Sequence, residues 1–444
     1  MQKKIIALAV AGLVSGAAFA QSTVTIYGTA DGSFEAVSAS GQTSNGAVNT
    51  TASFASRTRV QSNNSLIGFK TAESLGNGLT AVAQFETNVN LGGSVNGAST
   101  ASSALFGAQR DTYVGIAGSF GTVAAGYLST PTRSTLVMFD VMPGATGAGG
   151  INSLLGHVNL GGVLNSQTAA GNTTNTFGTT TAAGVAITNN LNTVFRTTAI
   201  AYISPTISGF TGTLAYVPTT ARDNGPNNNN AAANLAGNAA LATRTPSAWN
   251  GSVTYVNGPI KVGYAYLRAT DTDVLANAGV TNPILLATGL SGAEKNSTHI
   301  LGAGYNFGNG FELNAVYDRV NVALSTVAQG DITVTRNAWW LGGKYVVGAN
   351  EFAASYATIG SNNVGNADNT LGAGNNYGNS GAKQISLRYG YNLSKRTQVY
   401  GLYTRVTNDA NGNFDVFNGS GVAAANTNAG ADPQVIGAGL RHNF

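Results

Sequence analysis

The stretch KQISLRYGYNL, residues 383–393, decides the fold of this chain. Apolar and polar residues alternate along it: Ile385, Leu387, Tyr389, Tyr391 and Leu393 share one face, while Gln384, Ser386, Arg388 and Asn392 share the other. A period of two indicates a β-strand, because successive side chains of a strand point to opposite faces. The turn sequence LSKR (393–396) follows, and then a second run, TQVYGLYT (397–404). Together they predict a β-hairpin.

Similar alternating runs recur along the chain, for example LTAVAQFE (79–86), IKVGYAYL (260–267), FELNAVYD (311–318) and PQVIGAGLRHNF (433–444). Short connections rich in Gly and Asn alternate with long ones: the short turns are 74–78, 118–121, 204–209, 256–259, 307–310, 347–350 and 393–396, and the long loops are about 37–53, 91–107, 129–194, 219–247, 272–296, 323–332, 361–381 and 408–431. Gly and Asn supply the positive φ that hairpin turns need. The pattern predicts sixteen antiparallel strands of about 9–11 residues, with both chain ends on one side.

The composition restricts the class of protein. The 444 residues include 59 Gly, no Cys and only 9% charged residues, against about 25% in ordinary soluble domains. Lys3 and Lys4 precede the apolar run IIALAVAGLV, and Ala18-Phe19-Ala20 follows it. This is the pattern of a secretory signal peptide, so we expect residues 1–20 to be removed and 21–444 to form the barrel; an N-terminal anchor is the alternative.

The mature chain has no strong charge. Removal of Lys3 and Lys4 leaves 20 of the 22 basic residues against 18 acidic residues, which argues against a nucleic-acid partner. The absence of Cys in an exported chain argues against a disulfide-stapled fold. No run of about 18 apolar residues follows the signal sequence, so a spanning helix is not expected.

A closed transmembrane barrel explains these features together. Aromatic residues such as Tyr305, Phe307 and Trp339 lie toward strand ends, as in the interfacial girdles of outer-membrane barrels. The polar faces of sixteen strands are too numerous for a packed interior and would line a water-filled lumen. In hydrocarbon the sheet must close, because every backbone group needs an internal partner. We therefore expect an all-β, sixteen-stranded antiparallel barrel, with Phe444 in the strand that closes it.

Several segments resemble one family. They are TVTIYGTADGSF (23–34), SLIGFKTAESLGNGLTAVAQFE (65–86), RDTYVGIAGSFGTVAAG (110–126), RTTAIAYISPTISGF (196–210), YGYNLSKRTQVYGLYT (389–404) and GLRHNF (439–444). They are similar to the general diffusion porins of Gram-negative bacteria, in particular the betaproteobacterial type. The resemblance implies a homotrimer, long extracellular loops, and a third loop, here about 129–194, that folds into the lumen and narrows it. It also implies that Phe444 is read by the barrel assembly machinery.

The chain departs from that family at positions that are usually basic. Leu66 stands in place of an Arg, Thr80 in place of a basic residue, and Tyr127-Leu128 in place of Arg-Gln. In the family these residues form the basic wall of the constriction. We therefore expect the pore to be at most weakly anion-selective.

Selectivity in such a pore is electrostatic and depends on charges at its narrowest part. Candidates with lumen-facing parity are Lys70, Glu86, Lys261, Glu312, Lys344 and Arg388, while Arg57, Arg59 and Arg110 lie near outer strand ends and could reach the constriction. Arg133 and Asp140 are the only charged residues in 129–194. We expect these two at the constriction and Asp140→Asn to favour anions. For each candidate the alternative is an ordinary solvated charge.

No catalytic constellation is evident. The histidines His157, His299 and His442 show no spacing to a nucleophile or to metal ligands, so we expect no enzymatic activity, no cofactor and no metal. The predicted function is an outer-membrane channel for passive diffusion of ions and small hydrophilic solutes, with outer-membrane lipid and lipopolysaccharide as surroundings. The alternatives are a substrate-specific uptake channel and a secreted β-solenoid adhesin, although no fixed repeat of about 20–50 residues supports the adhesin.

Overall fold

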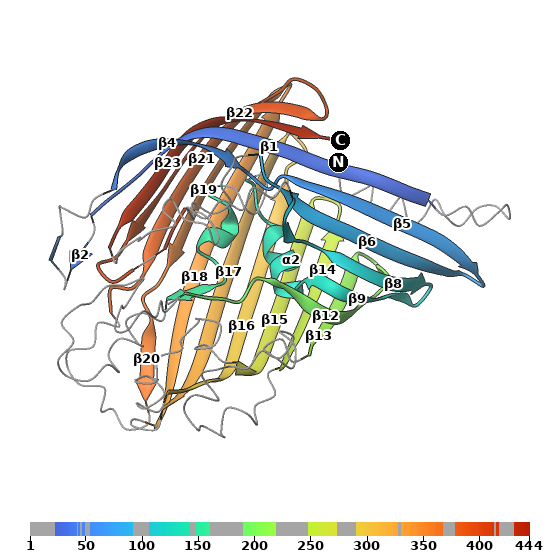
Figure 1. The fold of residues 1–444 in the computed structure, drawn as a ribbon, viewed down its shortest axis with the longest axis horizontal. Helices are drawn as coiled ribbons and strands as arrows, with labels where there is room; N and C mark the ends of the chain where they lie inside the picture. Colours follow the sequence, from blue (N-terminus) through green and yellow to red (C-terminus); the bar gives the residue numbers. More distant parts are fainter. Residues whose placement is uncertain are drawn as a thin grey trace.

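A computed structural model describes residues 23–41, 43–44, 47–48, 54–91, 106–142, 148–159, 190–218, 247–272, 290–326, 330–366, 378–412, 414–416 and 430–444. The predicted signal peptide, residues 1–20, lies outside these ranges. Within them the chain is almost entirely antiparallel sheet (Figure 1). The helices among the described residues are short, and none has the length and apolar character to cross a membrane.

Nineteen strand segments form one sheet. They are β1 (Thr23–Ser40), β4 (Phe54–Ser62), β5 (Leu66–Gly76), β6 (Leu79–Val89), β7 (Phe106–Gln109), β8 (Thr112–Gly118), β9 (Gly121–Ser129), β12 (Arg196–Ile203), β13 (Phe210–Val217), β14 (Ser247–Asn257), β15 (Ile260–Thr272), β16 (Leu290–Asn306), β17 (Phe311–Thr326), β18 (Gly330–Val347), β19 (Asn350–Ile359), β20 (Asn363–Asn366), β21 (Ala382–Asn392), β22 (Thr397–Asn408) and β23 (Asp432–Asn443). A separate two-stranded ribbon joins β2 (Thr43–Ser44) and β3 (Ala47–Val48).

Three pairs of segments are each one interrupted strand. β4 and β5 both pair with β1, β7 and β8 both pair with β6, and β19 and β20 both pair with β18. Short irregular stretches separate the members of each pair, and one of them contains Asn64 at a φ of 50°. Counted this way, nineteen segments make the sixteen strands that the sequence predicts.

The first and last strands close the sheet into a barrel. β1 pairs with β23 from Thr29 opposite Asn443 to Ser40 opposite Asp432, and the two run side by side in Figure 1. Beyond this register Gly28 and Phe444 exchange both backbone hydrogen bonds, each at 3.1 Å. Every strand then has two neighbours, so the sheet closes and has no edge strand.

Along β21 the barrel is apolar outside and polar inside. On β21, Ile385 and Leu387 are 45% and 48% exposed, whereas Gln384 and Ser386 are each 2% exposed. A soluble sandwich would bury the apolar face instead. This inverted pattern identifies the outer face as the surface that contacts lipid.

The seven short turns all connect strands at one end of the barrel, as predicted. The β5–β6 turn shows why they are tight: Gly76, Asn77 and Gly78 adopt φ values of 81°, 52° and 75°, which Gly and Asn tolerate best. Strands such as β5, β6, β14 and β21 have the predicted 9–11 residues, at 11 each, but β12 and β13 have 8, and β1 and β18 each have 18. A long strand such as β18 continues beyond the apolar belt toward the long loops, where outward residues such as Thr335 and Asn337 are polar.

Candidate functional site: the neck of the lumen

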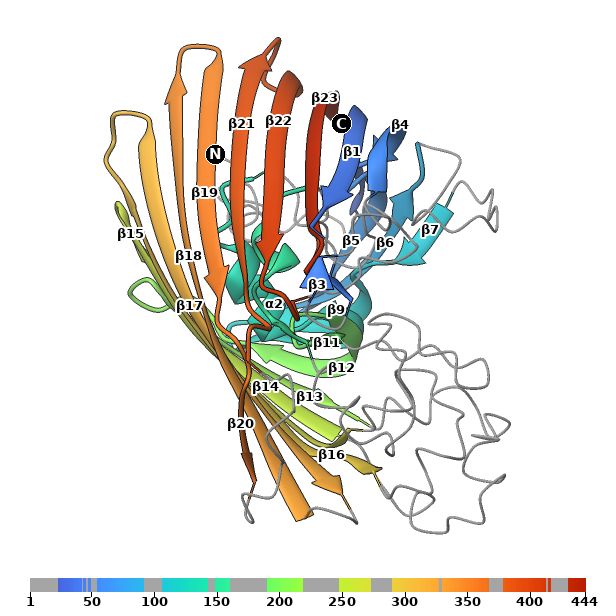
Figure 2. The ribbon, with the colours of Figure 1, turned by 90° about the vertical axis from the view of Figure 1, so that its left-hand side faces the viewer.

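The connection between β9 and β12 enters the barrel at helix α2 (Pro131–Val137), which the strands surround in Figure 2. Thr130 caps this helix: its hydroxyl accepts the backbone N–H of Arg133 at 3.5 Å. Pro131 occupies the first turn, where the missing N–H has no partner to lose. The Thr130 hydroxyl also donates to the Phe195 carbonyl at 2.8 Å, so the start and the end of this connection are tied together.

The inner wall has small residues where the helix docks. Inward-facing Gly263 on β15 and Gly302 on β16 lie beneath the Phe139 ring. A Cβ added at Gly302 would lie 2.2 Å from that ring, and one added at Gly263 would lie 3.0 Å from Thr135. Phe139 is fully buried there. Glycine at these two positions therefore lets the connection lie against the wall rather than in the middle of the lumen.

Polar wall side chains fix the helix at both ends. Asn250 on β14 accepts the N–H of Thr132 at 3.1 Å, and its side-chain amide donates to the Thr132 hydroxyl at 2.9 Å. Beyond the helix, Lys261 donates to the Met138 carbonyl at 3.1 Å and Asn314 donates to the Phe139 carbonyl at 2.9 Å. Backbone N–H groups satisfy the Ser134, Leu136 and Val137 carbonyls at the end of the helix, and these two side chains satisfy the next two carbonyls, those of the C-cap Met138 and of Phe139.

Further along, the connection forms a buried core with the wall. After the short helix η2 (Ile151–Ser153), the Gly156 N–H donates to Asp318 at 2.7 Å, and Arg336 donates to the His157 carbonyl. Asp318 and Arg336 pair at 2.7 Å with almost no exposure. Apolar residues of the connection and of the wall form one buried cluster that includes Leu136, Phe139, Ile151, Leu154, Leu155, Ile300, Val316 and Trp340. The expectation of a wholly polar lumen face is therefore wrong for β15–β18, where the described part of the third connection packs against apolar inward residues.

A water-accessible cavity of about 600 Å³ remains beside the helix, and we call it the neck cavity. Its lining residues come from the third connection, from the irregular stretches before β5 and β8, from β9, β12, β18 and β19, and from β21–β23 with the turn between β21 and β22. They are Asn64, Arg110, Asp111, Ser129, Arg133, Ser134, Val137, Asp140, Val141, Met142, Arg196, Lys344, Glu351, Asn392, Ser394, Lys395, Arg396, Thr397, Gln398, Arg441 and Asn443. The narrowed lumen thus has the helix on one side and strand side chains on the other.

Basic residues outnumber acidic ones around the neck cavity. The seven basic residues are Arg110, Arg133, Arg196, Lys344, Lys395, Arg396 and Arg441, and the three acidic ones are Asp111, Asp140 and Glu351. Four of the basic residues are paired with carboxylates: Arg110 with Glu86, Arg196 with Asp111 at 3.2 Å, Arg441 with Asp31 at 3.2 Å, and Lys344 with Glu312 at 3.6 Å. These pairs hold the side chains in place but cancel much of their charge.

Three cations at the neck cavity form no ion pair with any carboxylate among the described residues: Arg133, Lys395 and Arg396. Arg133 is 6% exposed and belongs to helix α2. Burial, together with the neighbouring cations Arg196 and Arg110, lowers the pKa of the Arg133 guanidinium to about 10. It remains charged at neutral pH, and these three residues give the cavity a positive excess.

Asp140 is the one acidic residue that the third connection contributes to the neck cavity. Its carboxylate accepts the backbone N–H groups of Met142 at 2.9 Å and Ile151 at 3.2 Å. Burial deep inside the barrel raises the pKa of the Asp140 carboxyl to about 7, although both hydrogen bonds lower it. The residue as a whole is half-buried and belongs to the cavity lining. The negative charge of Asp140 is therefore incomplete at neutral pH.

The structure places four of the predicted constriction residues at the neck cavity: Arg110, Arg133, Asp140 and Lys344. Three further predicted residues, Glu86, Lys261 and Glu312, lie outside the cavity lining and form ion pairs that involve Arg110 and Lys344. Glu86 pairs with Arg110 and accepts the Tyr27 hydroxyl at 2.9 Å. Lys261 pairs with Glu312, and Glu312 also pairs with Lys344.

The remaining candidates lie elsewhere on the inner wall. Arg388 pairs with Glu351 at 2.9 Å and stacks on the Tyr400 ring. Arg59 pairs with Glu35 at 3.2 Å, and Arg57 is exposed on β4 opposite Val37. The ammonium of Lys70 lies 4.7 Å from the centre of the Tyr27 ring. None of these four belongs to the cavity lining.

Six charged lining residues were not anticipated: Asp111, Arg196, Glu351, Lys395, Arg396 and Arg441. For three of these residues the sequence contained information that could have suggested a place in the lumen. Lys395 and Arg396 form the turn LSKR, and Arg441 lies on the polar side of the final strand. Alternation shows which residues face inward, but not which of them lie at the same height as a connection more than 200 residues away.

Comparisons with known proteins agree with this architecture. The profile of the Gram-negative porin family matches residues 7–411. Outer membrane porin protein 32 of Delftia acidovorans is 28% identical over 449 residues, covering 100% of both chains. Two solved structures share the fold. An anion-selective porin from Comamonas acidovorans has a TM-score of 0.59 and 21% identity, covering 96% of this chain and 100% of that one. The trimer form of OmpT from Vibrio cholerae has a TM-score of 0.52 and 14% identity, covering 96% and 100%.

The matched region extends from before the first strand into the last long connection, between β22 and β23, so it covers all strands of the barrel except β23. The inverted outer face, the closed sixteen-stranded sheet and the water-accessible neck are the features that such a channel requires. The chain belongs to the Gram-negative porin family, and it forms an outer-membrane channel for the passive diffusion of ions and small hydrophilic solutes.

Proposed function

We propose that this channel favours anions, and that the neck cavity sets the preference. The observation that supports this most directly is the charge of its lining, with seven basic residues against three acidic ones. Arg133, Lys395 and Arg396 are not neutralised by described carboxylates. A narrow water-filled passage with low-dielectric walls focuses such a field on passing ions.

The basic residues of the neck cavity lie at other positions than the three on which the expectation of weak anion selectivity depends. The expectation of at most weak anion selectivity was based on Leu66, Thr80 and Tyr127, which stand where the family has basic residues. In the structure, Arg196 and Arg441 bring guanidinium groups to the cavity from β12 and β23. A related fold, the Comamonas acidovorans porin, is described as anion-selective. The preference should be larger at low salt, since the Debye length is about 10 Å at 0.1 M.

We further propose that three copies assemble into a homotrimer that contacts lipopolysaccharide and is inserted by the barrel assembly machinery. The trimer form of Vibrio cholerae OmpT, which shares the fold, supports this assembly. A band of three times the monomer mass before heating, and of monomer mass after heating, is the expected electrophoretic result. A monomer band in both lanes would contradict the assembly without affecting the proposed selectivity.

The selectivity is tested by the zero-current potential of single channels in a KCl gradient. The wild type should give the sign of chloride preference. The variant Arg133→Gln should reduce the chloride-to-potassium permeability ratio about threefold, because one charge at ~7 Å in water is worth about 0.6 kcal/mol. Adding Lys395→Gln and Arg396→Gln should reduce it further. The matched control is Lys383→Gln, which removes one charge from the outer face of β21 and should change nothing. A potassium preference in the wild type would overturn the proposal.

A further inference from the structure

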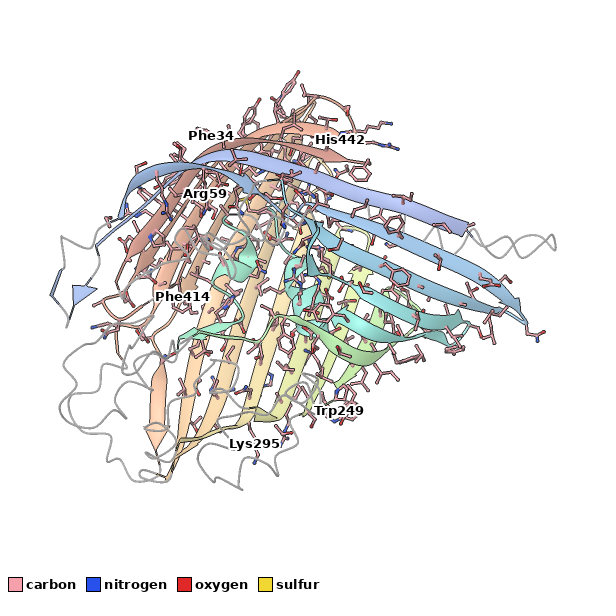
Figure 3. The ribbon with its side chains drawn as sticks, in the orientation of Figure 1. Phe34, Arg59, Trp249, Lys295, Phe414 and His442 are labelled. Carbon is pink, nitrogen blue, oxygen red and sulfur yellow. The ribbon has the colours of Figure 1, made fainter. Side chains whose placement is uncertain are left out.

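The last long connection, between β22 and β23, also enters the lumen. Two of its apolar residues, Phe414 and Val416, are 2% and 0% exposed. They belong to the same buried cluster as the apolar residues of the third connection, together with Val37 of β1 and Val435 of β23. Figure 3 shows Phe414 inside the barrel, below these two strands in that view. The described part of the last connection therefore packs within the barrel rather than only covering its entrance.

Asn408, the final residue of β22, holds Phe414 in place. Its side-chain oxygen accepts the Phe414 N–H at 2.8 Å, and its side-chain amide donates to the Phe414 carbonyl at 2.9 Å and to the Ala431 carbonyl. Asn408 is 8% exposed and Ala431 is fully buried. Buried amides of this kind are normally fully hydrogen-bonded, and here a single amide fixes both the entry and the return of the last connection.

Backbone hydrogen bonds tie the stretch before Phe414 to the start of β21. The Asp409 N–H donates to the Gly381 carbonyl at 2.9 Å, and the Asn411 N–H donates to the Asn379 carbonyl at 2.8 Å. A Cβ added at Gly412 would lie 2.4 Å from the Gly381 carbonyl oxygen, so glycine permits this close approach. The last connection therefore has a fixed starting point from which Phe414 and Val416 reach into the lumen.

One hydrogen bond joins the last connection directly to the third connection. The Gly149 N–H donates to the Val416 carbonyl at 3.0 Å. Gly149 has a φ of 79°, and a Cβ there would lie 2.6 Å from the Ser386 hydroxyl of β21. That hydroxyl donates to the Gly149 carbonyl at 3.4 Å. Gly149 is therefore held between the wall at β21 and the last connection.

The segment after Gly149 leads directly to the neck cavity. Ser153 donates to Gln384 of β21 at 2.9 Å, and the Ile151 N–H donates to the Asp140 carboxylate at 3.2 Å. Asp140 lines the neck cavity. The bond to Val416 and the bond to Asp140 thus lie two residues apart along the third connection. A displacement of Val416 would be passed through this segment to the lining of the neck.

The third connection is consequently attached on two sides of the lumen. Asp318 of β17 holds Gly156 on one side, and Asn408 of β22 holds the last connection on the other. The two anchors lie on one cross-strand row of the sheet, four strands apart, or roughly 19 Å along the wall at about 4.8 Å per strand. A segment attached at both ends of such a span can shift only if one attachment breaks.

We propose that Phe414 and Val416 are positioning residues for the neck. Burial of their side chains stabilises the last connection inside the barrel. From there it holds the third connection against β21 and limits the width of the passage. Without these side chains the Gly149 N–H loses its partner, residues 149–153 move away from the wall, and the neck becomes wider and more variable. The proposal concerns the passage of solutes of any charge, so it does not depend on the proposed anion preference.

The experiment truncates both side chains in Phe414→Ala/Val416→Ala and records single channels in planar bilayers and the uptake of neutral sugars of increasing size into liposomes. The open-state current noise should rise severalfold, and sugars that the wild type excludes should enter. The matched control is Phe210→Ala/Val253→Ala, which removes the same two types of side chain from the outer faces of β13 and β14, where they are 53% and 52% exposed. It should behave like the wild type.

Two further variants separate positioning from folding. Phe414→Leu keeps an apolar side chain and should retain the quiet wild-type current. Asn408→Ala removes the bonds to Phe414 without altering the apolar cluster, and it should give a smaller increase in noise, so it replaces the double variant if that chain does not fold. Heat-dependent gel mobility verifies folding.

Two results would overturn the proposal. The first is wild-type noise and an unchanged size limit in the folded truncation variants. The second is a larger current with wild-type noise, which would mean that the last connection obstructs the passage without holding the third connection.

Discussion

Two parts of the inner wall obey the same alternation and differ in what they face. The wall of β14–β17 and the long-loop part of β18 has small and apolar inward residues, such as Gly302, Ile300 and Val316, and the third connection packs on it. The wall formed by β9, β12, β21–β23 and the short-turn ends of β18 and β19 has charged residues that line the neck cavity, such as Lys344 and Arg441. We call these the dry wall and the wet wall.

The two walls show that facing the lumen does not by itself make a residue polar. Inward residues become apolar where a segment of the chain covers them, because burial of apolar area then stabilises the contact. They remain charged where water can reach them. Even the charged residues of the dry wall, Asp318 and Arg336, are paired and bonded to the third connection. The position of the pore is therefore set by which wall the connection covers.

The largest expected difference between the walls concerns two cations of the same strand, β18. Arg336→Gln leaves Asp318 buried without its partner and should cost about 3–5 kcal/mol of stability. Lys344→Gln on the wet wall should cost about 0–1 kcal/mol, because Glu312 keeps Lys261 as a partner. Unfolding by guanidinium in detergent measures both. Similar losses for the two variants would remove the distinction between a dry wall and a wet wall.

A smaller effect is expected from one methyl group on the dry wall. Gly302→Ala places a Cβ 2.2 Å from the Phe139 ring, and the buried ring cannot move without overpacking, which should cost about 1–3 kcal/mol. Gly343→Ala on the outer face meets nothing closer than 3.5 Å, so a change of about 0.5 kcal/mol or less is expected. The same unfolding measurement applies, and single-channel noise should increase only in Gly302→Ala. A fully tolerated Gly302→Ala would mean that the connection does not press on this wall.

The smallest effect concerns pH at the wet wall. The pKa of Asp140 is raised to about 7 from 3.8, so the folded state favours its protonated form. This contribution to stability is complete below pH 3.8 and is lost as pH rises through about 7. The same titration adds a negative charge to the neck, so the chloride-to-potassium permeability ratio should fall about threefold between pH 5.5 and 8.5.

The variant Asp140→Asn is the control for that titration. It should hold the permeability ratio near its low-pH value across the whole range, because an amide carries no charge at either end. Zero-current potentials recorded at several pH values measure the ratio. A pH dependence that persists in Asp140→Asn would assign the titration to another group and place Asp140 outside the path of the ions.

Much of the fold could be predicted because its signals are local. Alternation in runs such as 383–393 marks the strands, and Gly and Asn mark the short turns. Helix α2 was missed although Thr130-Pro131 is a typical start of a helix, because the run that follows is only seven residues long. The strand interruption at Asn64 was missed because a bulge depends on the pairing of both strands.

The site was harder to predict for a physical reason. Arg133 and Asp140 could be proposed because they are the only charged residues in a long connection. Arg196, Glu351 and Arg441 come from strands far apart in the sequence, and they meet only through strand tilt and barrel closure. Alternation fixes the direction of a side chain but not its height in the lumen.

The most direct test of the two walls uses single cysteines, since the chain contains none of its own. Ser134 on helix α2 is exposed and lines the neck cavity, whereas the adjacent Thr135 is 1% exposed and faces the dry wall. The measurement is the loss of conductance as Ser134→Cys or Thr135→Cys channels react with negatively or positively charged thiol reagents. We predict that Ser134→Cys is blocked, faster by the negative reagent, and that Thr135→Cys does not react. Equal reaction of the two variants, or faster block by the positive reagent, would contradict a basic neck bordered by one face of the helix.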